Sequence, residues 1–94
     1  MRIVYRAVTA PFPPALISAL TTGELDAVLH FSKRSADNYI AGARQAGIAK
    51  EALAVRQVCL SAQIADSLAG AGHIAIAKRP DEAALIAALE AAQA

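Results

Sequence analysis

The stretch Asp26 to Gly47, DAVLHFSKRSADNYIAGARQAG, decides the fold class. It begins with a continuous apolar run, Ala27 to Phe31, whose lack of alternation predicts a strand buried on both faces. Ser32 or Ser35 can cap the helix that follows, and Gly47 is a natural end for that helix. A buried strand that passes directly into a helix is the unit from which parallel α/β sheets are built.

The rest of the chain repeats this unit. Strands are predicted over residues 3–8, 27–31, 55–60 and 74–77, each followed by a helical pattern. The last helix is capped by Asp81, with Leu85, Ile86 and Leu89 as its apolar stripe. Four strand–helix units with short connections require right-handed crossovers. The sequence therefore predicts an α/β domain with a parallel sheet and helices on both faces, flavodoxin-like or Rossmann-like.

Composition limits the domain count and the class of partner. Ninety-four residues, 56% of them hydrophobic, predict one domain over residues 1–94. A net charge of +1 and four aromatic residues argue against nucleic-acid binding. No apolar run is long enough to cross a membrane, and the first residues form no signal peptide. With one cysteine, Cys59, an internal disulfide is excluded, and we expect a cytoplasmic protein.

The turns after the strands concentrate polar groups. Parallel sheets bind ligands at the carboxyl ends of their strands, where helix N-termini present free N–H groups. The first of these turns is Thr9-Ala10-Pro11. The later turns contain four of the nine basic residues and three serines: Lys33, Arg34, Lys78, Arg79, Ser32, Ser35 and Ser61. Taken singly, these serines are ordinary helix caps and the cations are solvated helix ends. Because they converge on one edge, the sequence predicts a site for a ligand with several carboxylates or phosphates.

Other sites are not supported by the sequence. No glycine-rich phosphate loop follows any strand. His30 and His73 lie on different elements, so a metal site is not expected. His30 sits near the end of a strand and could reach the ligand edge, but a hydrogen-bonded core histidine is the favoured interpretation. Cys59 is predicted to be a buried strand residue whose pKa is raised by apolar neighbours.

Four segments taken in order, VYRAV, GELDAVLHFSKRSADNYI, VCLSAQIADSL and IAIAKRPDEAALIAAL, suggest a family. With them the chain resembles, over almost its entire length, the C-terminal part of uroporphyrinogen-III synthase. The resemblance implies a lyase of tetrapyrrole (haem) biosynthesis, which closes hydroxymethylbilane to uroporphyrinogen III and inverts the last pyrrole ring. It implies no metal or organic cofactor. It also implies a substrate with eight carboxylates, held in a cleft between two α/β domains.

The resemblance assigns a catalytic residue and part of the substrate site. Tyr5 matches the tyrosine of the family's VY strand, which is implied to assist loss of the substrate hydroxyl as a hydrogen-bond donor. A structural strand aromatic is an equally weighted interpretation of Tyr5. Ser32 and Ser35 match the serine turn that follows the second strand and are implied to bind carboxylates.

Two other positions depart from the family pattern. Ser61 and Gln63 fall where many members carry a Gly-Pro-Thr-Thr-like turn, so Gln63 or backbone N–H groups would replace the threonine hydroxyls. Lys33 and Arg34 replace the commoner Ser-Pro and would add charge complementarity to acetate and propionate groups.

A complete family member is longer than this chain. The resemblance places the missing first strand between the strands at 3–8 and 27–31, so we expect a gap there or two exposed apolar edges. The implied partners are the N-terminal segment and the second domain, and the isolated fragment is expected to be inactive. The chain alone is expected to dimerise through exposed sheet edges or to displace its first strand. Two alternatives stay open: a noncatalytic flavodoxin-like interaction module, and an anion-binding domain for phosphosugars.

Overall fold

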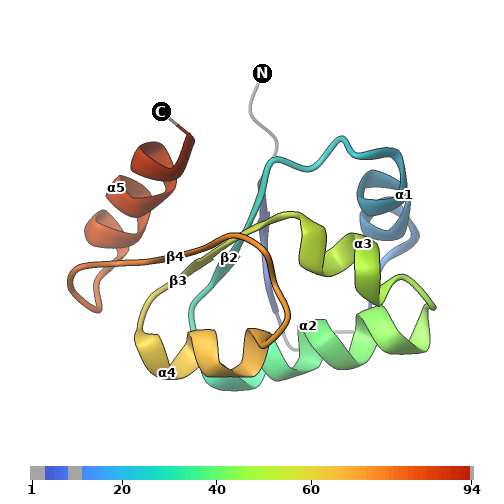
Figure 1. Ribbon diagram of the computed structural model, residues 1–94, viewed down its shortest axis with the longest axis horizontal. Helices are drawn as coiled ribbons and strands as arrows, with labels where there is room; N and C mark the ends of the chain where they lie inside the picture. Colours follow the sequence, from blue (N-terminus) through green and yellow to red (C-terminus); the bar gives the residue numbers. More distant parts are fainter. Residues whose placement is uncertain (1–3, 9–11, 94) are drawn as a thin grey trace.

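The computed structural model describes residues 4–8 and 12–93 (Figure 1). The predicted turn Thr9-Ala10-Pro11 lies outside the described residues. The strands are β1 (Val4–Arg6), β2 (Ala27–His30), β3 (Arg56–Cys59) and β4 (Ile74–Ile76). The helices are α1 (Pro14–Thr22), α2 (Lys33–Gln45), α3 (Ala49–Ala54), α4 (Ala62–Ala65) and α5 (Glu82–Gln93), with a 3-10 turn, η1 (Asp66–Leu68), after α4.

The four strands form one parallel sheet in the order β1-β2-β3-β4, which confirms the predicted fold class. Val28 of β2 lies in register between Tyr5 and Gln57. The predicted gap between the first two strands is wrong, because β1 pairs directly with β2. The ladder continues past β1, where the Ala7 amide donates to the Leu29 carbonyl over 2.8 Å. Unpaired backbone groups of two neighbouring strands satisfy one another when no third strand separates them.

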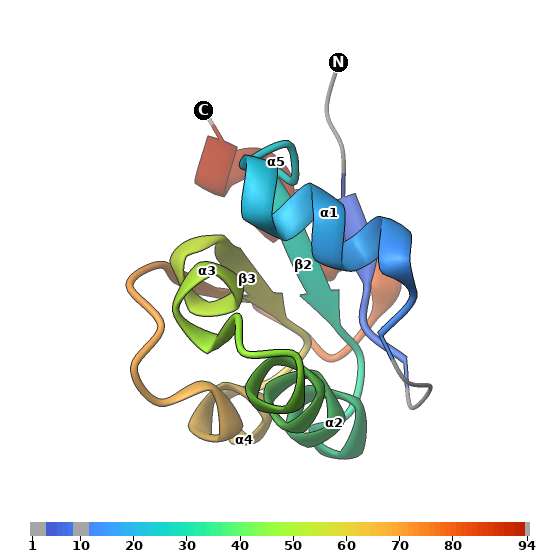
Figure 2. The ribbon, with the colours of Figure 1, turned by 90° about the vertical axis from the view of Figure 1, so that its right-hand side faces the viewer.

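Helices cover both faces of the sheet, but unequally (Figure 2). Each crossover steps one strand in the same direction, so right-handed connections put α1, α2, α3 and α4 on one face. The helix α5 follows the last strand and lies alone on the opposite face. The first face buries Leu20, Val28, Tyr39 and Leu68 among others. We call it the four-helix face, and the other the α5 face.

The burial of each strand follows from this layering. All four residues of β2 are buried, as the unbroken apolar run predicted. The edge strands are more exposed: Val4 is 40% exposed, and Ile74 and Ile76 are 40% and 45% exposed. Both outer edges of the sheet, β1 and β4, therefore present apolar side chains. The edges expected to be exposed between the first two strands are instead paired with each other.

A local signal accounts for the end of α1, whereas two other features of the helices differ from the prediction. Gly23 ends α1 at a φ of 75°, in the left-handed region that favours glycine. The short helix α3 was not predicted, because Ile48 before it provides no side-chain cap. Ile86 was wrongly placed in the buried stripe of α5: it is exposed, whereas Leu85 and Leu89 are buried. Successive helical residues differ by about 100°, so Ile86 points away from the sheet.

Candidate functional site

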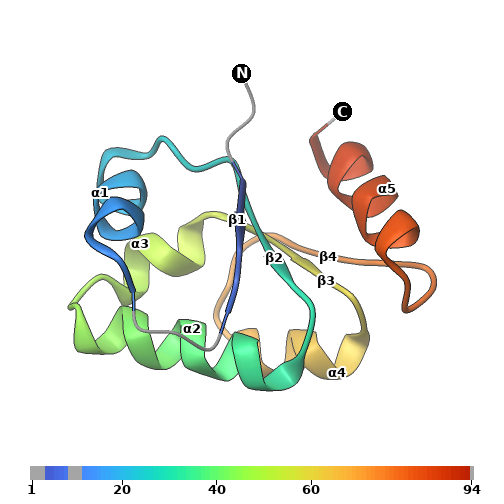
Figure 3. The same cartoon turned by 180° about the vertical axis from the view of Figure 1, so that it is seen from behind.

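The carboxyl ends of the strands meet at one edge of the sheet. The Leu60 amide donates to the His30 carbonyl over 3.0 Å, and the Ala77 amide donates to the Cys59 carbonyl over 2.9 Å. The chain therefore leaves β2, β3 and β4 at neighbouring points. Figure 3 shows α2 and α4 beginning beside each other beyond these strand ends. We call this the carboxyl edge.

Ser32 and Ser35 form a closed cap at the start of α2. The Ser32 hydroxyl accepts from the Ser35 amide at 3.1 Å and donates to the Ser35 hydroxyl at 3.1 Å. The Ser35 hydroxyl in turn donates to the Ser32 carbonyl at 3.0 Å. Ser35 is buried and Ser32 is exposed. The cap leaves the Lys33 and Arg34 amides without an intrahelical acceptor, so the turn presents N–H donors toward the edge.

Lys33 and Arg34 place two cations on this turn. The Lys33 ammonium donates to the Ser67 hydroxyl over 2.8 Å and lies 3.8 Å from the Asp37 carboxylate. It therefore connects the first turn of α2 with η1, next to α4. Arg34 is exposed and has no ion pair among the described residues. Both cations lie next to the free amides, which is the arrangement that binds carboxylates.

Ser61 lies on the neighbouring turn, before α4. It has the extended backbone of an N-cap residue, but its hydroxyl makes no cap hydrogen bond. Its half-buried side chain has no hydrogen-bond partner in the described part of the chain. Gln63, two residues later in α4, is exposed. The structure therefore brings Ser61 and Gln63 to the same edge as the serine cap of α2.

Arg6 also reaches this edge and was not among the predicted site residues. It ends β1, and its guanidinium lies 4.0 Å from the centre of the Phe31 ring. Sequence alone could have indicated it only as a cation at the end of a strand. Arg79 lies in the middle of the turn between β4 and α5, 3.3 Å from the Asp81 carboxylate. Lys78 precedes it and makes no ion pair within the described residues.

Tyr5 lies away from these turns. It occupies the middle of β1, in register with Val28, two positions before the end of β2. Its half-buried ring packs against the core of the four-helix face. Burial raises the pKa of its hydroxyl. The structure therefore places Tyr5 below the carboxyl edge, on the face opposite to Arg6.

His30 and Cys59 lie in the core, as predicted. The His30 Nε2 atom lies 2.7 Å from the Gln57 Oε1 atom, and the ring stacks edge-on against Tyr39. Gln57 donates through Nε2 to the carbonyls of Ala52 and Val55, so its Oε1 atom accepts from His30. Burial lowers the pKa of His30 and raises the pKa of the Cys59 thiol to about 12. A thiol with that pKa is not a nucleophile at neutral pH.

Among the described residues, the carboxyl edge carries cations and amide donors rather than a metal-binding cluster of side chains. In residues 4–8 and 12–93 there is no cluster of three or more histidine, cysteine, aspartate or glutamate side chains that could hold a metal ion. No helix in the same part of the chain is long and apolar enough to cross a bilayer. The free amides of α2, the cations Lys33 and Arg34 and the unpaired Ser61 hydroxyl are what the edge offers to a ligand.

Comparison with known proteins gives a family. No curated protein and no solved structure matches the chain. The family model of uroporphyrinogen-III synthase HemD matches residues 1–87, which is nearly the whole chain. The match covers all four strands and the first half of α5. The chain therefore belongs to the uroporphyrinogen-III synthase family.

Proposed function

We propose that this chain binds the polycarboxylate tetrapyrrole of the family reaction at the carboxyl edge, as part of a uroporphyrinogen-III synthase. The observation that carries the proposal is the convergence of Lys33, Arg34 and the unpaired Ser61 hydroxyl on one edge of a chain that matches this family. Such a substrate is recognised by many separate carboxylate contacts. Amides and cations on neighbouring turns supply contacts of this kind.

The proposed substrate-binding residues divide into two groups. Lys33 and Arg34 attract carboxylates directly, and Ser61 and Gln63 offer hydrogen bonds from the neighbouring turn. Ser32 and Ser35 act mainly through the cap, because their hydroxyls are already bonded to each other. By capping α2 they hold its first amides in the orientation that a carboxylate needs. Ser32 is the more exposed of the two, but its single hydroxyl proton is donated to Ser35, so either hydroxyl can donate to a carboxylate only after a change in the cap.

In the proposed reaction, the enzyme positions an open chain and stabilises a cation. The substrate hydroxyl takes up a proton and leaves as water, and the azafulvene-like cation that remains is attacked by a carbon of the last pyrrole ring. Loss of a proton after inversion and closure gives the macrocycle. We propose Tyr5 as the hydrogen-bond donor to the departing hydroxyl. A tyrosine phenol is protonated at neutral pH, as a donor must be, and burial raises the pKa of Tyr5 further.

Catalysis is proposed to require partners. The implied partners are the N-terminal segment and second domain of a complete synthase, and without them the chain is expected to be inactive. The partner strand would either separate β1 from β2 or pair with an exposed edge, at Val4 of β1 or at Ile74 and Ile76 of β4. Mixing the chain with the N-terminal segment of a synthase and assaying ring-inverted product tests this requirement. No gain in product over either component alone would contradict it.

Binding can be tested separately from catalysis. Anaerobic calorimetry with uroporphyrinogen III is expected to detect binding that Lys33→Gln and Arg34→Gln each weaken roughly two- to fivefold, as for exposed ion pairs. Arg44→Gln is the matched control, because Arg44 lies in the last turn of the same helix. Equal losses in all three variants would contradict a site at the first turn of α2. Displacement of the tetrapyrrole by simple phosphate esters would favour the phosphosugar-binding alternative.

A further inference from the structure

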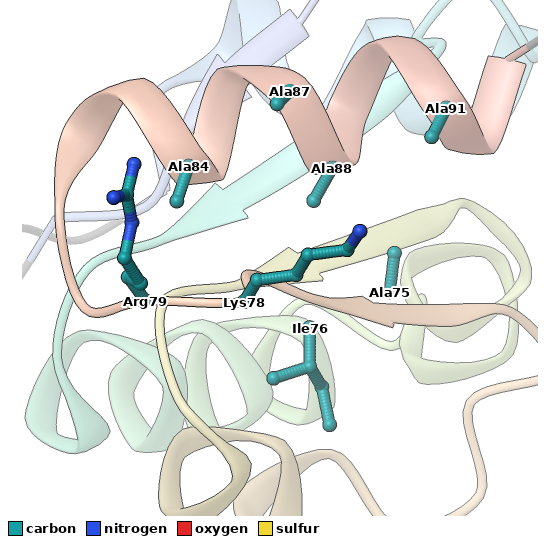
Figure 4. Close-up of a pocket in the computed structure, with 8 residues that line it drawn as sticks. All are labelled: Ala75, Ile76, Lys78, Arg79, Ala84, Ala87, Ala88 and Ala91. Atoms are coloured by element: carbon teal, nitrogen blue, oxygen red, sulfur yellow. The ribbon is translucent and has the colours of Figure 1, made fainter.

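A groove lies on the α5 face, between β4 and α5, apart from the proposed tetrapyrrole site. It has a volume of about 740 Å³, within the range of small-molecule sites. Its lining consists of six apolar residues and two cations: Ala75, Ile76, Ala84, Ala87, Ala88, Ala91, Lys78 and Arg79. We call it the alanine groove (Figure 4).

The groove exists because the residues around it are small. The large side chains of α5, Leu85 and Leu89, pack with Leu29 and Val58 over the middle of the sheet. The side of α5 that faces β4 carries alanines, and Ala75 faces them from the strand. Larger side chains at these positions would close the space, as they do in well-packed interiors.

Charge distinguishes the groove from a plain apolar surface. Its lining holds two cations and, among the described residues, no acidic side chain. Arg79 lies near Ala84 and is paired with Asp81 at 3.3 Å. In Figure 4 the Lys78 side chain runs along β4, and its ammonium lies between Ala88 and Ala75. Lys78 makes no ion pair within the described chain, so the groove joins an apolar wall to one uncompensated positive charge.

We propose that the alanine groove binds an amphipathic carboxylate. The apolar body of this ligand lies against the alanine side of α5, and its carboxylate meets the Lys78 ammonium. An apolar body is favoured because it removes alanine surface from water, and an anionic head is favoured because Lys78 lacks a counter-charge. The proposal does not depend on the synthase activity. Lys78 and Arg79 are among the cations that the sequence predicted at the carboxyl edge, but the tetrapyrrole contacts proposed above are made by the turns before α2 and α4.

Octanoate and 1-octanol are suitable probes, followed through the alanine methyl signals of the labelled chain by NMR titration. We expect saturable shifts of the groove alanines with both ligands. Lys78→Gln should weaken octanoate about fivefold and leave octanol unchanged, because only the carboxylate contacts the charge. The control is Lys50→Gln, an exposed lysine of α3, which should alter neither titration. Equal weakening of both ligands by Lys78→Gln would overturn the proposal.

Filling the groove provides a second test. The double variant Ala87→Leu and Ala91→Leu changes exposed positions, so it is expected to fold, and it should weaken both ligands at least about tenfold by occupying their space. Ala41→Leu, an exposed alanine of α2, is the control for added bulk. Unchanged binding in the filled variant would place the ligand elsewhere. A ligand-free dimer that the filled variant dissociates and that binds no octanoate would show a second copy in the groove, and would also overturn the proposal.

Discussion

Four helical segments cover one face of the sheet, whereas α5 alone covers the other. The four-helix face buries an aromatic contact between Phe12 and Tyr39, with ring centres 5.4 Å apart, and a polar network around Gln57. The buried part of the α5 face consists of apolar side chains, among them Leu85 and Leu89, with no buried hydrogen bond between side chains in the described residues.

The two faces therefore differ in what they provide: the four-helix face provides buried hydrogen bonds, and the α5 face leaves open space. On the four-helix face, hydrogen bonds tie α2, α3 and β3 together: Tyr39 donates to the Ala52 carbonyl over 2.7 Å, and Gln57 donates to the same carbonyl over 2.9 Å. On the α5 face one helix of mostly small residues cannot cover four strands, and the alanine groove remains open. We therefore expect the four-helix face to dominate stability and the α5 face to tolerate substitution.

Truncation of Tyr39 is the strongest test of this difference. Tyr39→Ala is expected to lower the free energy of unfolding by about 3–5 kcal/mol, because a fully buried ring leaves a cavity. Urea unfolding followed by circular dichroism measures it. Tyr39→Phe should cost only about 1 kcal/mol, because Gln57 still bonds to the Ala52 carbonyl. A loss below about 1 kcal/mol for Tyr39→Ala would mean that this face is not the main source of stability.

The matching truncation on the other face should cost less. Leu85→Ala is expected to lower the free energy of unfolding by about 2–3 kcal/mol, because the neighbouring groove lets water reach part of the cavity. Ile86→Ala, exposed on the same helix, should change it by less than about 0.5 kcal/mol. The same urea titrations rank the variants. If Leu85→Ala proved more costly than Tyr39→Ala, the assignment of stability to the two faces would have to be reversed.

Acidification should weaken the four-helix face through His30. Its Nδ1 atom is buried without a partner, so a proton there would add an unsatisfied donor and a buried charge. Burial lowers the pKa of His30 below its ordinary value of 6.5, so the unfolded chain takes up the proton first as the pH falls. This contribution to stability is complete above about pH 6.5 and declines below it, with a maximum slope near 1.4 kcal/mol per pH unit.

Unfolding free energies measured from pH 7.5 down to 5 test this dependence. A His30→Gln variant that folds should lose the slope. If the unfolding free energy of the parent chain did not change over this pH range, His30 would accept its proton equally well in the folded and the unfolded chain.

The smallest expected effects compare two serines at the carboxyl edge. Ser32→Ala should cost about 1 kcal/mol, because it removes the cap of α2. Ser61→Ala should cost close to nothing, because the Ser61 hydroxyl makes no cap hydrogen bond. Thermal unfolding of the two variants distinguishes them. A comparable loss for Ser61→Ala would assign its hydroxyl a structural role and remove the reason for proposing it as a ligand-binding group.

Sequence reasoning identified several of the groups that lie at the carboxyl edge, because the signals for these groups are local. A serine that caps a helix accepts a hydrogen bond from the amide three residues later, so it can be recognised in the sequence. Ser32 caps α2 in this way, through the Ser35 amide. The cations Lys33 and Arg34 follow directly. Arg6 was missed because its contact is with Phe31, twenty-five positions later, and depends on β1 lying next to β2. The gap that was expected between β1 and β2 is absent for a related reason, because strand order is a property of the assembled sheet and not of either strand.

The sequence by itself determined that β2 is buried, that a helix capped by Ser32 or Ser35 follows it, and that strands alternate with helices, because apolar periodicity and capping act over a few residues. Only the tertiary structure decided that β1 pairs with β2, that His30 bonds to Gln57, and that an open groove separates α5 from β4. Those features depend on which faces meet and on how completely the side chains fill the space between them. The contacts between faces and the filling of space both result from packing between residues that are far apart in the chain, so no local sequence pattern encodes them.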